Sequence, residues 1–377
     1  MVKMRVVVSG GGTGGHIYPA LAIARALQEK ADAKILYMGS KERNGEASLE
    51  QRLATFAGFT FTGVSACGLH RKSPLIVRDL QTNYRGMLEA KAVLQKFLPH
   101  IVIGTGGYGA APVLKAATKL NIPILIHEQN AYPGITNRYL APQAALVCLT
   151  FEAAKEYFSP KSKFVLTGLP VRQEIITANR AEAYSYFGLN PDKTTLLVTG
   201  GSQGATVINE AMLDSYGKMI KCGAQIIHLT GPEHFSAIQE RLEQEGLWGH
   251  KSLVIFDYLE RMDLAIAIAD LVVSRAGASF LAEIMCQGVG AVLVPYPFAA
   301  GNHQMLNAQA MADAGAAVII PNQDLNSQRL LAEVIPLIET KANQKRLAMS
   351  AAAKAMAHTD AAEKIADLAI QIAKVGR

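Results

Sequence analysis

Short apolar runs alternate with segments of helical periodicity along the whole chain. In the first half, the apolar runs predict strands at 5–9, 35–39, 101–104, 124–127 and 145–149. The segments between them predict helices that begin near Tyr18, Leu49, Arg85, Ala111 and Thr136. The runs are rich in β-branched residues and lack a clean polar alternation, which is typical of parallel strands buried on both faces. The pattern therefore predicts a doubly wound parallel α/β sheet.

The same pattern begins again near residue 195. There "TLLVTGGSQGATVINEAML" repeats the design of the opening "VVVSGGGTGGHIYPALAIA": an apolar strand, a glycine loop and a helix. Further runs predict strands at 225–229, 254–256, 271–274, 291–295 and 317–320. We therefore predict two Rossmann-like domains, 1–166 and 167–356, joined within 159–172, where Pro, Gly and charged residues gather. An Ala-rich helical segment follows at about 357–377.

Composition narrows the class of protein. The chain has 377 residues, of which half are hydrophobic, as expected for a globular protein of two domains. Its four cysteines are scattered and no secretory segment is evident, which favours a reducing cytoplasm. No apolar run approaches the length that crosses a bilayer, so we expect no membrane span.

Charge is distributed unevenly between the two halves. Residues 1–166 carry 20 Lys and Arg against 10 Asp and Glu, whereas residues 167–377 carry 17 against 21. A basic half favours an anionic partner, such as a lipid headgroup, a polyphosphate or nucleic acid. Ordinary surface variation is the alternative. Nucleic-acid binding is not favoured, because only 7% of the residues are aromatic and there is a single Trp.

Three glycine-rich loops, 10–15, 104–109 and 200–204, follow predicted strands. Glycine lets backbone N–H groups approach a phosphate, and the helix that follows adds a favourable dipole. One such loop can reflect strand-to-helix packing alone, but three indicate a ligand site at the carboxyl ends of the strands. The first loop matches the dinucleotide fingerprint, yet the second strand ends in Gly39-Ser40-Lys41 rather than in an acidic residue. A dehydrogenase is therefore disfavoured.

Several polar residues beside these loops are candidates for chemistry. His16 begins a predicted helix, where the dipole favours a neutral imidazole that can accept a proton. Glu283, within "SRAGASFLAEIMCQG", has apolar neighbours and can accept both hydroxyls of a ribose, although a solvated helix Glu is the alternative. The loops "HEQNAYPGITNR" and "GNHQMLNA" are dense in polar side chains, as functional loops often are.

Seven ordered motifs resemble one family. They are "GGGTGGHIYPALAIA", "GTGGYGAAP", "HEQNAYPGITNR", "GLPVR", "GGSQGA", "SRAGASFLAE" and "HQMLNA". This series is similar to the bacterial peptidoglycan enzymes called undecaprenyldiphospho-muramoylpentapeptide β-N-acetylglucosaminyltransferases. The segment 41–79 departs from the family, and no residue is assigned there. The resemblance implies the GT-B fold: two Rossmann-like domains that face a cleft, with the C-terminal helix packed back on the first domain.

The resemblance also implies the reaction and its residues. N-acetylglucosamine would pass from UDP-N-acetylglucosamine to the 4-hydroxyl of the muramoyl sugar of lipid I, with inversion, to form lipid II. His16 is the first choice for the group that activates this hydroxyl, and Glu128 is the second. Gly106, Gly107 and Tyr108 would face the acceptor diphosphate. The donor would be bound by Thr13, Gly14, Gly15, Asn130, Arg172, Ser202, Leu259, Ala278, Ser279, Phe280, Leu281, Ala282, Glu283 and Gln304.

The partners follow from this implied chemistry. No Asp-x-Asp occurs in the chain, so we expect neither a metal nor another cofactor in the site. The acceptor is a membrane lipid, so the first domain should attach peripherally to the cytoplasmic side of the cell membrane. Leu75, Ile76 and Val77, flanked by Arg71, Lys72 and Arg78, suit an anionic membrane surface, although a buried helical turn is the alternative. Other wall-synthesis enzymes are further candidate partners.

Two other functions fit parts of the sequence. A UDP-N-acetylglucosamine 2-epimerase or a diacylglycerol glycosyltransferase would keep the nucleotide-binding half, but "GTGGYGAAP" and "HEQN" argue against both. A binding module without activity could use the same site. Transfer assays on His16→Ala and Glu283→Ala variants separate these alternatives.

Overall fold

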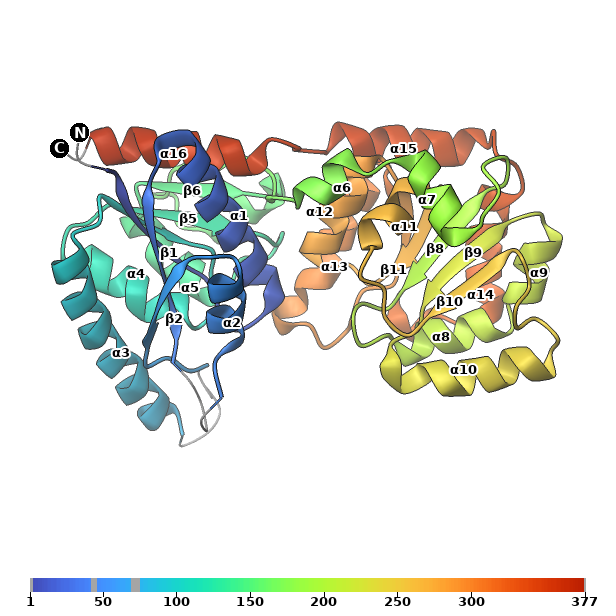
Figure 1. The fold of residues 1–377 in the computed structure, drawn as a ribbon, viewed down its shortest axis with the longest axis horizontal. Coiled ribbons are helices and arrows are strands. Elements are labelled where there is room, and N and C mark those ends of the chain that lie inside the picture. The colour runs from blue at the N-terminus through green and yellow to red at the C-terminus, as the bar shows by residue number, and fades with distance from the viewer. Residues whose placement is uncertain (1–2, 42–45, 69–74, 376–377) are drawn as a thin grey trace. The chain divides into compact units, whose positions relative to one another are not determined.

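The computed structural model describes residues 3–41, 46–68 and 75–375. The chain forms two compact units (Figure 1). Unit 1 comprises Met1–Val171 and His358–Arg377, and unit 2 comprises Arg172–Ala357. The chain first passes from unit 1 to unit 2 between Val171 and Arg172. This position lies inside the joining segment expected from the sequence, a few residues after the predicted domain boundary at residue 166.

Unit 1 is built on a seven-stranded parallel sheet with the order β3-β2-β1-β4-β5-β6-β7. Its strands are β1 (Arg5–Ser9), β2 (Lys34–Ser40), β3 (Thr60–Val64), β4 (Ile101–Gly104), β5 (Ile124–Glu128), β6 (Leu146–Leu149) and β7 (Phe164–Leu166). Its helices are α1 (Gly14–Ala31), α2 (Leu49–Phe56), α3 (Ile76–Phe97), α4 (Ala110–Lys119), α5 (Ile135–Leu140) and α16 (Ala361–Val375).

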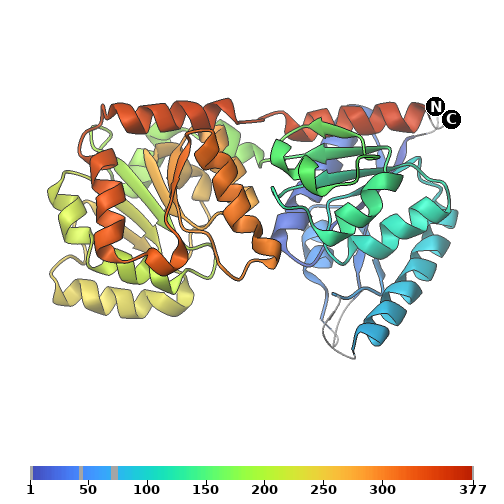
Figure 2. The same ribbon diagram turned by 180° about the vertical axis from the view of Figure 1, so that it is seen from behind.

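Successive residues of β1 supply the cores on the two faces of this sheet. Val6 and Val8 pack with α1, α2 and α16, whereas Val7 packs with α3 and α4. The helices themselves can be followed in Figure 1 and, from behind, in Figure 2. This arrangement explains why the strand sequence shows no polar alternation. The C-terminal helix is therefore part of the unit 1 core: Ile365, Ala366 and Ala369 are fully buried, and Asp367 bonds Lys30 at 2.6 Å.

Three features of unit 1 differ from the sequence prediction. Helix α1 begins at Gly14 rather than near Tyr18, because the first turn of a helix tolerates residues of low propensity. Helix α3 begins at Ile76 rather than near Arg85. Strands β3 and β7 were not predicted. Both lie at edges of the sheet, and of their residues only Val64 is fully buried, so their apolar signal is weak.

Unit 2 carries a six-stranded parallel sheet with the order β10-β9-β8-β11-β12-β13. Its strands are β8 (Thr195–Thr199), β9 (Gln225–Leu229), β10 (Leu253–Phe256), β11 (Leu271–Ser274), β12 (Gly290–Leu293) and β13 (Ala317–Ile319). Its helices are α6 (Gln173–Thr177), α7 (Arg180–Phe187), α8 (Thr206–Leu213), α9 (Tyr216–Lys221), α10 (Pro232–Gln244), α11 (Met262–Ile268), α12 (Ala278–Gln287), α13 (His303–Asp313), α14 (Ser327–Ile338) and α15 (Gln344–Ala355).

Each sheet has one topological switch point. Strand β1 lies between β2 and β4, and β8 lies between β9 and β11, so the connections from each pair run in opposite directions. At such a point the loops diverge and leave a crevice at the carboxyl ends of the strands, where ligands of doubly wound folds bind. All three glycine loops predicted from the sequence flank these two points.

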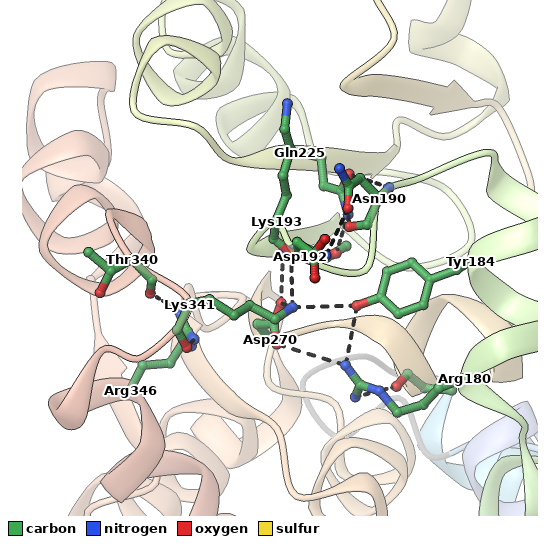
Figure 3. Close-up of polar contacts among 12 residues, drawn as sticks. Arg180, Tyr184, Asn190, Asp192, Lys193, Gln225, Asp270, Thr340, Lys341 and Arg346 are labelled. Atoms are coloured by element: carbon green, nitrogen blue, oxygen red, sulfur yellow. Dashed lines mark hydrogen bonds and ion pairs between the residues drawn. The ribbon is translucent and has the colours of Figure 1, made fainter.

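A polar cluster at the opposite, amino-terminal edge of the unit 2 sheet is structural (Figure 3). Asp270 accepts hydrogen bonds from Lys341 Nζ at 2.6 Å and from the backbone N–H of Thr195 at 2.8 Å. The guanidinium of Arg346, which is 2% exposed, donates to the carbonyl oxygens of Leu337, Thr340 and Lys341. These bonds fix the turn between α14 and α15.

Among the described residues, no helix is both long and apolar enough to cross a membrane.

Candidate active site

Two glycine loops interlock at the switch point of unit 1. The first follows β1 and the second follows β4, and Gly11 N–H donates to Gly106 O at 3.4 Å. Gly107, with φ +79°, lies so close to Gly11 O that a Cβ would overlap it. Gly12, with φ +90°, lies against Tyr108: a Cβ there would be 2.7 Å from the ring. The loops approach each other this closely only because they lack side chains.

His16 lies where these loops meet. Its ring packs on Gly106, where a Cβ would be 3.1 Å from His16 Cδ2. Its Nδ1 lies 3.1 Å from the hydroxyl of Thr13, the N-cap residue of α1, whose side chain makes no hydrogen bond to the helix backbone. Thr105 donates to His16 O at 2.7 Å and so holds the turn from the other loop. The imidazole is thus held in one orientation on a half-buried surface.

Glu128, at the end of β5, is 1% exposed and is surrounded by neutral donors. Its Oε1 accepts from the backbone N–H of Asn130 at 3.0 Å. Its Oε2 accepts from Gly134 N–H at 3.0 Å and from Asn137 Nδ2 at 2.8 Å. Burial raises the pKa of Glu128, and these hydrogen bonds oppose the shift. Because both oxygens are engaged, the carboxylate holds the loop that carries Asn130.

His127 and Gln129 form the buried base of the same loop. His127 Nε2 bonds Gly168 O at 2.9 Å, and burial lowers its pKa from 6.5 to about 4. Its ring is therefore neutral near pH 7 and donates through Nε2–H. Gln129 Nε2 donates to Thr105 O at 2.8 Å, which ties this loop to the second glycine loop.

Unit 2 presents its own loops at its own switch point. The loop after β8 has positive φ angles at Gly201 and Gly204, and it exposes Ser202 to solvent. The turn after β11 leads into α12, whose N-cap residue is Gly277. Gln304 Oε1 accepts from Ala276 N–H at 3.2 Å and from Tyr296 N–H at 2.9 Å, so its NH2 group is the part that can donate to a ligand.

Glu283 and Arg172 form an ion pair within unit 2. Arg172 Nη2 and Nε donate to the same carboxylate oxygen, Oε1, at 2.9 and 3.2 Å. The Glu283 side chain is 14% exposed and that of Arg172 is 47% exposed. Burial raises the pKa of Glu283, while Arg172 opposes the shift. The sequence suggested separate roles for these residues, whereas the structure joins them.

Other predicted donor residues differ in accessibility. Ser279 and Phe280 are partly exposed on α12, whereas Leu281 is fully buried and Ala278, Ala282 and Leu259 are nearly so. The side chain of Leu281 belongs to the core, so contact between it and a ligand is not supported. Among the described residues, no three His, Cys, Asp or Glu gather as metal ligands.

Apolar side chains form an exposed stripe along α3. Val77, Leu80, Tyr84 and Leu88 are each about half exposed, and their spacing places them on one side of the helix. Leu75, just before the helix, is also exposed, but Ile76 is only partly so. Arg78 is exposed, whereas Arg71 and Lys72 lie outside the described residues.

Comparison with known proteins identifies the family. Residues 6–148 match the glycosyltransferase family 28 N-terminal domain, and residues 195–365 match the family 28 C-terminal domain. A UDP-N-acetylglucosamine–N-acetylmuramyl-(pentapeptide) pyrophosphoryl-undecaprenol N-acetylglucosamine transferase from Desulforamulus reducens is 44% identical over 354 residues, covering 92% of this chain and 93% of the relative. The chain belongs to this family of glycosyltransferases.

Solved structures agree with this assignment. The crystal structure of MurG from Acinetobacter baumannii superposes on this glycosyltransferase with a TM-score of 0.77 and 28% sequence identity. The superposition covers 98% of this chain and 99% of the MurG chain. The UDP-GlcNAc 2-epimerase of Methanocaldococcus jannaschii, at TM-score 0.62 and 14% identity over 98% of this chain and 100% of its own, shares only the fold. The predicted fold class, GT-B with two Rossmann-like domains, is confirmed. The family resemblance is confirmed as well.

Sequence reasoning missed some residues of the site. Asn137, which bonds Glu128 and lies beside Gly106, appeared only as one letter of a polar loop. Glu50 was left in an unassigned segment, yet its carboxylate lies against the first glycine loop. The apolar stripe extends beyond Val77 to Leu88. A predicted helix that began at Ile76 would have revealed it, because the spacing of these residues places them on one side of such a helix.

Proposed function

We propose that this glycosyltransferase transfers N-acetylglucosamine from UDP-N-acetylglucosamine to the 4-hydroxyl of the muramoyl sugar of lipid I, forming lipid II. The observation that carries the proposal is the 44% identity, across nearly the whole chain, to a relative named for this transfer. The two switch-point sites, one in each unit, suit one acceptor and one donor.

The nucleotide part of the donor binds unit 2 in this proposal. Glu283 accepts both ribose hydroxyls, and Arg172 moves from Glu283 to the diphosphate, where its planar guanidinium suits phosphate oxygens. Ser202 donates to the diphosphate, and the Gln304 NH2 group donates to a sugar hydroxyl. The ion pair with Arg172 compensates the Glu283 charge until the nucleotide replaces Arg172 with two hydroxyl donors.

The acceptor binds unit 1. His16 accepts the proton of the 4-hydroxyl through Nε2, because its Nδ1 faces Thr13. The hydroxyl oxygen attacks the anomeric carbon as the bond from that carbon to UDP breaks, which inverts the centre. Arg172 stabilises the charge that develops on the departing UDP. Glu128 keeps its oxygens within the loop and positions Asn130, which makes His16 the better candidate for the base.

Unit 1 also attaches to an anionic membrane surface on the cytoplasmic side, where lipid I is available. The stripe of Val77, Leu80, Tyr84 and Leu88 enters the headgroup region, and Arg78 with its basic neighbours contacts anionic lipid. Each such cation contributes about 1 kcal/mol near the surface. If flotation with phosphatidylglycerol vesicles is unchanged by Leu80→Glu with Tyr84→Glu, or by Arg71, Lys72 and Arg78→Glu, the attachment is wrong.

The transfer is tested by UDP release with a lipid I analogue that carries a short lipid chain. We expect His16→Ala to lower kcat by about 10²- to 10⁴-fold, the usual contribution of a general base, with little change in UDP affinity. Glu283→Ala should mainly weaken UDP binding. A wild-type enzyme that releases no UDP with this acceptor, or a His16→Ala variant of normal kcat, would contradict the proposal.

A further inference from the structure

Glu50 comes from the segment that the sequence left without an assignment. It is the second residue of α2, directly after the N-cap Ser48 and Leu49, yet only 1% of its surface is exposed. A carboxylate buried in the first turn of a short helix needs partners that the helix itself does not supply. Its hydrogen-bond partner is Ser40, at the end of strand β2.

One carboxylate oxygen of Glu50 is held at the end of β2. Its Oε1 accepts from the backbone N–H of Ser40 at 3.1 Å and from the Ser40 hydroxyl. Tyr37, also on β2, donates its hydroxyl hydrogen to Gly10 O at 2.6 Å. Burial, together with the nearby Glu50 charge, raises the pKa of Tyr37. The carboxylate is thus fixed relative to the sheet.

Three glycines, two from the glycine loops and one from strand β2, surround the same side chain. A Cβ on Gly11 would lie 2.5 Å from Glu50 Oε1, and one on Gly109 would lie 3.2 Å from it. A Cβ on Gly39 would lie 2.7 Å from Glu50 Cγ. Real Cβ atoms do not approach other atoms within about 3 Å, so a side chain at Gly11 or Gly39 would force the Glu50 side chain to move. Gly109 has an ordinary negative φ of −65° and is limited only by this contact.

We propose that Glu50 is a positioning residue, which sets the spacing between the two glycine loops of unit 1. Gly11 belongs to the first loop and Gly109 to the second, and Glu50 Oε1 lies against both. His16 packs on the second loop at Gly106, and Tyr108 packs on the first loop at Gly12. A shift between the loops therefore moves the proposed base relative to the acceptor surface.

The inference rests on the proposed function of unit 1 as the acceptor unit. Glu50 supplies a hydrogen-bond acceptor oxygen on a side chain of a particular length. Glutamine has the same length and also carries an acceptor oxygen, so it should replace Glu50. We expect Glu50→Gln to stay within about threefold of wild type in kcat/KM for the lipid I analogue. Glu50→Ala should lose about 10- to 100-fold, because a displacement near 1 Å between reacting groups costs about that much.

The matched control is Glu89, which makes the same kind of bonds to another serine. Glu89 accepts from Ser65 N–H at 2.8 Å and from the Ser65 hydroxyl at 3.2 Å, after the neighbouring strand β3, and touches no glycine loop. Glu89→Ala should leave kcat/KM for the acceptor within about threefold. UDP affinity, measured by calorimetry, should be unchanged in every variant, because the proposed nucleotide contacts lie in unit 2.

A second pair of variants keeps the test sharp if Glu50→Ala does not fold. Gly109→Ala inserts a methyl group against the carboxylate and should lower acceptor kcat/KM, while Glu50→Asp in the same chain withdraws the carboxylate and should restore part of it. If the two substitutions only destabilised the fold, their separate effects on the free energy would add.

Three results would overturn the inference: equal losses in Glu50→Ala and Glu89→Ala, equal losses in Glu50→Ala and Glu50→Gln, or simple additivity of the Gly109 and Glu50 changes. If the wild-type enzyme does not use the acceptor at all, it is the proposed function that fails, and not the role of Glu50.

Discussion

Glu128, at the end of β5 in unit 1, and Glu283, on α12 after β11 in unit 2, are both carboxylates of low exposure, and burial raises the pKa of both. Their partners differ. Glu128 is bonded on both oxygens by neutral amides of its own loop, whereas Glu283 is bonded on one oxygen by a half-exposed arginine. The first arrangement fixes a loop. The second can exchange its partner for a ligand, and this contrast separates a positioning carboxylate from a binding one.

The largest expected effect concerns His127, which precedes Glu128 in the loop that this carboxylate fixes. Its pKa is about 4 in the folded protein and near 6.5 when unfolded, so the unfolded state binds more protons between these values. The free energy of unfolding should therefore fall as the pH drops from 6.5 to 4, by about 1.4 kcal/mol per unit and about 3 kcal/mol in all. Urea denaturation across this range measures it.

The variant His127→Gln isolates this contribution. His228 in unit 2, with a pKa of about 3, changes stability in the same direction, so the wild-type slope contains both histidines. The difference in slope between wild type and His127→Gln belongs to His127 alone. Identical slopes would mean that His127 is not a buried neutral group in solution.

The next effect is on the exchangeable carboxylate. Glu283→Gln removes the charge that Arg172 contacts and that we propose the ribose hydroxyls contact in the complex, and hydrogen bonds to a charged group are worth about 1.5–3 kcal/mol. UDP should bind about 10- to 100-fold more weakly in calorimetry. The melting temperature should hardly move, because an ion pair with a half-exposed arginine contributes little to stability. A large drop in melting temperature without weaker UDP binding would make Glu283 structural.

The same substitution at Glu128 should have the opposite outcome. Glu128→Gln places an NH2 group against the backbone N–H of either Asn130 or Gly134, and an unsatisfied donor costs about 1–3 kcal/mol. The wild-type carboxyl, with its raised pKa, holds its proton more tightly when folded, so stability should fall as the pH rises through that pKa. The variant should lose this dependence and keep its UDP affinity. Weaker UDP binding in Glu128→Gln would erase the contrast.

The smallest expected effect is none. In the proposed mechanism Arg172 and a helix N-terminus supply the positive charge near the donor, so we expect full activity in excess EDTA. Activity that EDTA abolishes and Mg²⁺ or Mn²⁺ restores would show that the arginine of the exchangeable pair is not sufficient.

The sequence predicted the sheets better than the contacts between side chains. Runs such as 101–104, 225–229 and 271–274 match strands residue for residue, because fully buried parallel strands are continuously apolar. The glycine loops and His16 also follow from the local pattern. The pairing of Arg172 with Glu283, the three donors around Glu128 and the place of Glu50 beside Gly11 do not. Each of these joins segments that are separated in sequence, or depends on the geometry of a loop.

The burial of α16 in the core of unit 1 has a practical consequence. Unit 1 is assembled from two pieces of chain, and unit 2 is a cassette inserted between positions 171 and 358. Trimming the C-terminus would therefore expose Ile23 and Leu27 on α1 and damage the half that carries His16, leaving unit 2, the proposed donor-binding half, intact. A chimera that exchanges the donor cassette needs two junctions, and cutting the gene only once after residue 171 would separate the first unit from its own last helix.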